Sequence, residues 1–328
     1  MERKTIINQL ELAHSPITAY EFSITKKNND FKKTLEESSL YIIAQRPVFS
    51  FENFVFNTEK DCLCFEIHQK ENYNKLHCKL PLIQKHIGSK EKNEFFIALN
   101  YLQKPKTTAK PPYGNLHGFS ICEQLQTEQK FLIWFSPEKL LYNWWNGQIN
   151  CEIKGDFRSF LNYPVHYVGK ATKQNIIKRL TGHDTFQDIL SLESPVTKKQ
   201  LPANEIVLLF FQFKDNVQFE TFDIDSDIKK VVSVYQGETY PNKEKIFLDA
   251  EKALINAMKP NYNKELFKNY PRSIDGLYED KYDVISYTFV DPINLRYSKG
   301  EIRGGLSFIG GDNIQIKDNE HIELIKHK

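Results

Sequence analysis

Tyr167-Val168-Gly169 follows directly on Pro164-Val165-His166, and the stretch from Pro164 to Val168 predicts a strand. Further along the chain, Glu205 to Phe213 is a run dominated by apolar residues and is long enough for a central strand. Segments with the pattern of helices lie between and after these two strands. The region from about 155 to 275 therefore predicts a domain in which strands and helices alternate.

Three segments of this region have the pattern of helices. Lys173 to Leu180 is short, Asp184 to Leu192 follows Gly182, and Ile246 to Met258 has the clearest apolar stripe. Pro260 ends the third helix, because a proline disfavours helical geometry in the residue before it. The apolar stripe consists of Phe247, Leu254, Ile255 and Met258.

Glu251 lies within the apolar stripe of the third helix, four residues after Phe247 and three before Leu254. A carboxylate that is buried without compensation costs several kcal/mol, so it needs a cation, hydrogen bonds or a proton. A divalent metal ion is one such cation. The structural alternatives are a salt bridge with a lysine or arginine, or a partly exposed position at the edge of the stripe. This position makes Glu251 a candidate metal ligand.

Arg179 and His183 are four residues apart, so a helix that continued through both would place them on one face. An arginine can donate two hydrogen bonds to a phosphate and stabilise the charge that develops on a pentavalent phosphorus. Tyr167 can act as a general base only if a neighbour or a metal draws off its proton, because the pKa of a free tyrosine is about 10. The structural alternatives are a solvated basic surface for Arg179 and a core position for Tyr167.

The order and spacing of these segments resemble the GIY-YIG nucleases, from the second motif of that family to its last, over roughly a third of the chain. The resemblance implies a small domain with a mixed three-stranded sheet flanked by helices. It also implies hydrolysis of a phosphodiester in one step, with Glu251 binding one Mg²⁺ or Mn²⁺ ion per active site. The matching segments are Tyr167-Val168-Gly169-Lys170-Ala171, Arg179-Leu180-Thr181-Gly182-His183, Ala250-Glu251-Lys252-Ala253-Leu254-Ile255 and Lys259-Pro260-Asn261-Tyr262-Asn263.

The resemblance implies a role for each of the other matching residues. Tyr167 would line the site, and Lys170 would lie near the phosphate or the attacking water. Arg179 would hold the scissile phosphate, while His183 would orient or deprotonate the tyrosine. Asn263 would support the site by hydrogen bonding.

The first motif of the family, Gly-Ile-Tyr, is not plainly present. The stretch at the corresponding distance before Tyr167 reads Gly155-Asp156-Phe157, which keeps the glycine and has no tyrosine. Tyr163 and His183 are candidate substitutes for the missing tyrosine. Alternatively, the partner strand of Tyr167 is Phe131 to Phe135, with an insertion before Tyr167.

The chain as a whole is expected to be α+β, with three parts. Residues 1–150 predict a β-rich α+β domain for recognition, sensing or dimerisation, with a loop near 104–114 that is rich in Pro, Gly and Lys. Residues 151–275 would form the nuclease domain, and residues 276–328 a strand-rich extension. The strand-like pieces of the first part include Leu40 to Ala44, Phe49 to Phe56, Cys62 to Ile67 and Lys130 to Phe135.

Composition limits the classes of protein that fit. The 328 residues are 40% hydrophobic and 13% aromatic, which argues against wholesale disorder. The net charge is only +2, so a nucleic acid would have to be held by a local basic surface. No apolar run approaches the ~18 residues of a membrane span, and the N-terminus lacks a signal-peptide core. We therefore expect a cytoplasmic protein without a membrane partner.

Five cysteines are expected to be reduced in that compartment. A zinc site is one interpretation of the cluster around Cys62, but the Cys-x-Cys spacing is not that of a zinc knuckle. Alternation along a strand favours thiols that fill a core. The cluster consists of Cys62, Cys64, His68, His77 and Cys78.

The leading hypothesis is a DNA endonuclease, with a role in restriction or antiviral defence because no helper domain typical of repair nucleases is recognisable. Cleavage of RNA is a second possibility. The alternative from another class is a catalytically impaired protein of the same fold that binds nucleic acid or a partner, for which the missing tyrosine is the best support. One active site per chain suggests a homodimer or two successive nicks.

Overall fold

The computed structural model describes residues 2–59, 61–81, 94–103, 105, 108–124, 129–172, 175–193, 204–306 and 310–327. Its contacts divide the chain into two compact units. The first unit consists of Met1–Arg46, Leu161–Lys198 and Glu205–Lys328, and the second consists of Pro47–Phe160 and Lys199–Asn204. The second unit is therefore inserted into the sequence of the first.

These boundaries differ from those predicted at 150/151 and 275/276, and the reason is strand pairing. Strand β3 (Leu40–Pro47) lies antiparallel beside β11 (Asn162–Lys170), with Tyr41 opposite Gly169. Strand β13 (Val284–Phe289) runs parallel to β1 (Arg3–Leu12). The N-terminal residues and the C-terminal strands thus complete one sheet, and neither forms a separate domain.

The first unit is built on a ten-stranded sheet with the order β15-β14-β11-β3-β12-β1-β13-β16-β17, and β2 pairs with β12. Its pairs are both parallel and antiparallel, so the expected α+β class and mixed sheet are confirmed. The sheet is much larger than the three strands expected. Its remaining strands are β2 (Ile17–Thr18), β12 (Asn204–Thr221), β14 (Asn294–Tyr297), β15 (Gly300–Arg303), β16 (Asn313–Lys317) and β17 (His321–Ile325).

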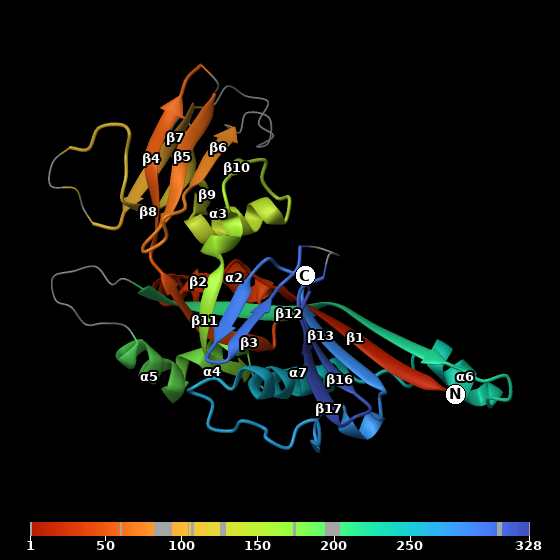
Figure 1. Cartoon of the computed structure of the whole chain (residues 1–328). Helices are drawn as coiled ribbons and strands as arrows, with labels where there is room; N and C mark the ends of the chain where they lie inside the picture. Colours follow the sequence, from red (N-terminus) through yellow and green to blue (C-terminus); the bar gives the residue numbers. More distant parts are fainter. Residues whose placement is uncertain are drawn as a thin grey trace. The chain divides into compact units, whose positions relative to one another are not determined.

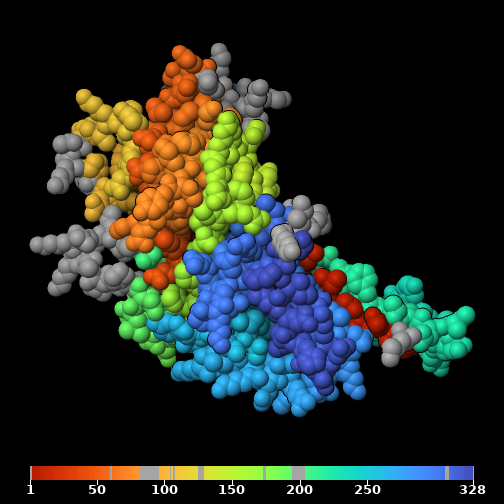
Figure 2. All heavy atoms as spheres, viewed as in Figure 1, coloured from red at the N-terminus to blue at the C-terminus, as the bar shows by residue number. Residues whose placement is uncertain are grey.

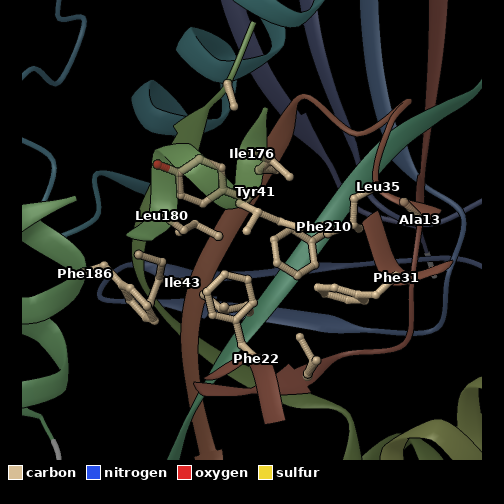
Figure 3. Close-up of a cluster of buried hydrophobic side chains, with 14 of the residues drawn as sticks. Ala13, Phe22, Phe31, Leu35, Tyr41, Ile43, Ile176, Leu180, Phe186 and Phe210 are labelled. Atoms are coloured by element: carbon tan, nitrogen blue, oxygen red, sulfur yellow. The ribbon is translucent and has the colours of Figure 1, made fainter. Parts of the chain in front are cut away.

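Four helices of the first unit contribute side chains to one aromatic core with β3 and β12. Phe22 and Phe31 pack on Phe210 of β12 in this core. Figure 3 shows Tyr41 at the margin of the cluster, with its hydroxyl turned away from these three rings. The helices are α1 (Ala19–Thr25), α2 (Asn29–Thr34), α4 (Ile176–Thr181) and α5 (Asp184–Leu192).

Helix α7 (Lys243–Met258) packs on the opposite face of the sheet (Figure 1). Its Phe247 lies against Phe213, with ring centroids 4.3 Å apart, and Phe213 points to the face opposite Phe210 because strand residues alternate. The side chain of Asn242 caps the helix by accepting a hydrogen bond from the backbone N–H of Lys245. The helix ends at Met258, as predicted, and begins three residues before the predicted start at Ile246.

The other predicted elements of this region agree with the structure to different degrees. Helix α5 has the predicted bounds, and β11 extends the predicted strand at both ends. Helix α4 begins at Ile176, and Lys173, where the prediction placed its start, lies outside the described residues. Helix α6 (Ile228–Tyr235), which follows β12, is partly or fully exposed at every residue and lies at the end of an extension of the first unit in Figure 2. A short 3₁₀ turn, η2, spans Tyr278–Asp280.

The second unit has a seven-stranded sheet with the order β10-β6-β5-β4-β8-β7, and β9 pairs with β8. Phe51, Phe65 and Phe119 form its aromatic core. The expected loop near 104–114 falls between two neighbouring strands of this sheet, β7 and β8. The elements are β4 (Phe49–Asn57), β5 (Cys62–Gln69), β6 (Leu76–Pro81), β7 (Glu94–Tyr101), β8 (Leu116–Gln124), β9 (Gln129–Phe135), α3 (Pro137–Trp145), β10 (Glu152–Lys154) and η1 (Phe157–Phe160).

The cysteine and histidine cluster lies on β5 and β6 of this sheet. Cys62 and Cys78 are buried, whereas the imidazoles of His68 and His77 both contact the carboxylate of Glu66. Among the described residues there is no group of three or more His, Cys, Asp or Glu side chains placed to hold a metal ion. Within the same residues, no helix combines the length and the apolar character that a membrane crossing requires.

Candidate active site

Two tyrosines meet where β3 and β11 pair. The ring centroids of Tyr41 and Tyr167 are 6.0 Å apart. Gly169 lies between them: a Cβ atom at this position would be 2.5 Å from Cε1 of Tyr167 and 2.7 Å from the hydroxyl oxygen of Tyr41. Real Cβ atoms do not approach other atoms so closely. The glycine of the Tyr167-Val168-Gly169 stretch therefore makes the space in which the two tyrosines come together.

We predict that Gly169→Ala destabilises the chain by about 1–3 kcal/mol, because the added methyl group overpacks the tyrosine pair. Urea unfolding followed by circular dichroism measures the loss. Gly182→Ala is the matched control, since a Cβ there would meet only the carbonyl oxygen of Lys178 at 3.7 Å. Equal destabilisation by both substitutions would contradict the packing role of Gly169.

His183 lies beside Tyr167, although α4 does not continue to it. The helix ends at Thr181, and His183 occupies the position before the first residue of α5. Its Nε2 atom is 3.2 Å from the hydroxyl oxygen of Tyr167, and the two rings meet edge to face with centroids 5.1 Å apart. The turn between the two helices thus places His183 beside Tyr167. Arg179 and His183 do not lie on one continuous helix, as the sequence had suggested they could.

Arg179 acts electrostatically on this cluster. Burial raises the pKa of Tyr41, Tyr167 raises it further, and the guanidinium of Arg179 opposes the shift. Burial likewise raises the pKa of Tyr167, with a second contribution from Glu251, and Arg179 again opposes the shift. The guanidinium therefore lies close enough to favour the deprotonated form of either phenol. Among the described residues, the Tyr41 hydroxyl has no hydrogen bond of regular geometry.

His183 is placed to accept a hydrogen bond from the Tyr167 hydroxyl. Burial lowers the pKa of its imidazole, and the positive charge of Arg179 lowers it further, against the opposing charge of Asp184. The imidazole is therefore neutral near pH 7. Its Nε2 atom makes the contact to Tyr167, whereas its Nδ1 atom is buried without a hydrogen-bond partner in the described part of the chain. A neutral imidazole in this position can accept a hydrogen bond from the Tyr167 hydroxyl and orient it.

Glu251 is buried on α7, as the helical pattern predicts, with 8% of its surface exposed. Its Oε2 atom lies 3.0 Å from the Nζ atom of Lys170, which is the last residue of β11. Burial raises the pKa of the Glu251 carboxyl, and the Lys170 ammonium opposes the shift. The salt bridge considered from the sequence is therefore formed, and its basic partner is Lys170.

A single buried carboxylate is a suitable ligand for Mg²⁺, but too little for a metal ion that must be coordinated entirely by protein side chains. Mg²⁺ keeps several waters and is commonly held by one or two carboxylates together with phosphate oxygens of the substrate. The charge of Glu251 raises the pKa of Tyr167, so the carboxylate lies near the tyrosine. Glu251 would hold the ion, but its Oε2 atom is paired with the Lys170 ammonium in this structure.

Asn263 holds the segment after α7 against β11. Its Nδ2 donates to the backbone oxygen of Val168 at 2.8 Å, and its Oδ1 accepts from the backbone N–H of Val168 at 3.0 Å. The backbone N–H of Tyr262 donates to the oxygen of His166 at 3.1 Å. These hydrogen bonds resemble those of an additional strand beside β11, and they fix the backbone on either side of Tyr167. A supporting role by hydrogen bonding is what the resemblance implies for Asn263.

Tyr163 is not part of the cluster. Its side chain is fully buried, and the charge that acts on its hydroxyl is that of Arg46. The ladder between β11 and β3 shifts register between Val165 and Tyr167, which adds one residue to β11. Because an extra residue reverses the alternation of faces, Tyr163 and Tyr167 do not share a face although they are four residues apart.

The tyrosine that lies beside Tyr167 is instead Tyr41, which was not predicted from the sequence. Strand β9, the alternative partner, pairs with β8 in the second unit, and Gly155 also belongs to that unit. The signal that was available is the strand-like stretch from Leu40 to Ala44, which contains a tyrosine. No protein-family model, curated protein or solved structure matches this chain.

Proposed function

We propose that this chain is a metal-dependent endonuclease that hydrolyses phosphodiester bonds in DNA, and that it has a GIY-YIG nuclease site. The observation that carries the proposal is the convergence of five side chains from β3, β11, α4, the turn before α5, and α7. Strand β3 lies antiparallel beside β11, as the strand with the family's first tyrosine would. The second unit is then an insertion between these two strands. The five residues are Tyr41, Tyr167, Arg179, His183 and Glu251.

In the proposed reaction, Arg179 holds the scissile phosphate and stabilises the negative charge that develops on it. Tyr167 passes its proton to Nε2 of His183 while it takes a proton from the attacking water, so no free phenolate accumulates. Tyr41 lies beside the Tyr167 hydroxyl and positions the water. A metal ion bound by Glu251 would neutralise the charge on the leaving oxygen. The site thus contains groups for both proton transfer and charge stabilisation.

The impaired, binding-only alternative loses its main support. It rested on the absence of the first tyrosine, and Tyr41 supplies a tyrosine beside Tyr167. A preference for DNA over RNA still rests on the resemblance, because Arg179 contacts a phosphate in either nucleic acid in the same way. The test of function therefore includes both substrates.

The direct test incubates the purified chain with supercoiled plasmid, linear duplex DNA and single-stranded RNA, in Mg²⁺, Mn²⁺ or EDTA. We expect nicked or linear plasmid with either metal and none with EDTA. Arg179→Ala is expected to lower the rate about 10²–10³-fold, the usual cost of removing one group that stabilises transition-state charge. Cleavage of RNA alone would assign the substrate to RNA. Binding of nucleic acid without cleavage under either metal would support the binding-only alternative.

A further inference from the structure

The Lys170 ammonium occupies the position beside Glu251 that a bound metal ion would take. Its ammonium nitrogen is 3.0 Å from Oε2 of Glu251, within the range of a direct ion pair. A metal ion held through the same oxygen cannot share this position with the ammonium, because two positive charges at such a distance repel each other strongly in a site of low polarity. Metal binding at that oxygen therefore requires the departure of Lys170.

Lys170 is the neighbour of Glu251 that can leave. Its side chain is 26% exposed against 10% for Glu251, and its four-carbon stem lets the ammonium move while the backbone stays in β11. The other lysine whose charge acts on Glu251 is Lys252. That side chain is only 5% exposed, and it is held by Asp275 at 2.6 Å and by the backbone oxygen of Leu248 at 3.2 Å.

We propose that Lys170 is a built-in competitor of the metal ion, which leaves Glu251 when a nucleic-acid phosphate offers it a second anionic partner. The inference rests on the proposed function, since it assigns regulation to the same site. Without nucleic acid, Lys170 keeps Glu251 occupied and the metal binds weakly. With nucleic acid, the phosphate draws Lys170 away, so metal and substrate strengthen each other's binding. The site is then loaded chiefly when a substrate is present.

Titration of Mn²⁺, with the free ion followed by electron paramagnetic resonance, tests this coupling independently of cleavage. Lys170→Met keeps the length of the side chain and removes its charge. We expect it to bind Mn²⁺ about tenfold more tightly than the wild type when no DNA is present, whereas Lys170→Arg keeps the weak affinity. A short DNA duplex should raise the Mn²⁺ affinity of the wild type and add little to that of Lys170→Met. Glu251→Gln with the same duplex corrects for Mn²⁺ bound by the DNA itself.

Lys154→Met is the matched charge control, because it removes the same charge from an exposed side chain of the second unit that pairs with Glu152. It should bind Mn²⁺ like the wild type. Lys170→Gln serves as a second neutral variant, and circular dichroism establishes that each variant is folded.

The outcomes separate this inference from the proposed function. If Glu251→Gln abolishes Mn²⁺ binding but Lys170→Met and Lys170→Gln bind no more tightly than the wild type, the competition is refuted and the metal site stands. If Glu251→Gln binds Mn²⁺ like the wild type, or if the wild type binds none with or without the duplex, Glu251 is not a metal ligand. In that case the proposed metal-dependent function fails together with the inference.

Discussion

Glu251→Gln is expected to lower the rate of metal-dependent cleavage about 10³-fold, which corresponds to about 4 kcal/mol of lost transition-state stabilisation. The substitution keeps the size of the side chain and removes the charge that would hold the metal ion. It also leaves Lys170 without its partner at 3.0 Å. Single-turnover rates on plasmid DNA, measured over a range of Mg²⁺ and Mn²⁺ concentrations, test the expectation. Excess metal should not restore the rate if the carboxylate is required for binding the ion in its reactive position.

The matched control for this variant is Glu244→Gln, on the same helix but at an exposed position in its first turn. It makes the same chemical change without touching the buried cluster, so its rate should equal that of the wild type. A wild-type rate for Glu251→Gln would remove the metal from the proposed mechanism. An equal loss in both variants would indicate that the charge of α7 as a whole matters, and not a ligand at position 251.

Local patterns predicted the part of the site that is local in sequence. The apolar stripe of α7 placed Glu251 on a buried face, and its exposed fraction of 8% agrees with that placement. The bounds of α5 follow from its sequence, since Gly182 and the position of His183 separate it from α4. Such features depend on helical periodicity and on breaks in it, which a single sequence contains.

The pairing of β3 with β11 could not be predicted in the same way. A strand such as Leu40–Pro47 has an apolar pattern that fits many partner strands. Its actual partner, β11, is separated from it in the sequence by the inserted second unit, so no local pattern identifies the pair. The extra residue between Val165 and Tyr167 has no distinct signal either, yet it decides that Tyr163 faces away from the site. Long-range pairing and a one-residue bulge therefore explain why the sequence indicated neither that Tyr41 lies beside Tyr167 nor that Tyr163 lies elsewhere.

Tyr41→Phe is expected to lower the cleavage rate about 10²-fold or more while leaving the fold intact. The substitution removes only the hydroxyl that lies beside Tyr167 and Gly169, and the ring can keep its packing in the core. Tyr167→Phe should lower the rate by at least as much, because it also removes the group that contacts His183 at 3.2 Å. If the two hydroxyls act on the same water, the double variant should be little slower than the slower single variant, since residues that act as a unit have non-additive effects.

Tyr163→Phe is the matched control, because it removes the hydroxyl of another fully buried tyrosine, on the strand β11 that pairs with the strand of Tyr41. The charge that acts on this hydroxyl is that of Arg46, which has no role in the proposed reaction, so the cleavage rate should not change. The comparison distinguishes the position of Tyr41 from a general sensitivity of the core to losing a hydroxyl. If Tyr163→Phe lowers the cleavage rate and Tyr41→Phe does not, the assignment is reversed. Tyr163, on the same strand as Tyr167, would then supply the missing hydroxyl. A slow Tyr41→Phe with normal thermal stability would support a site assembled from two strands separated in sequence by an entire folded unit.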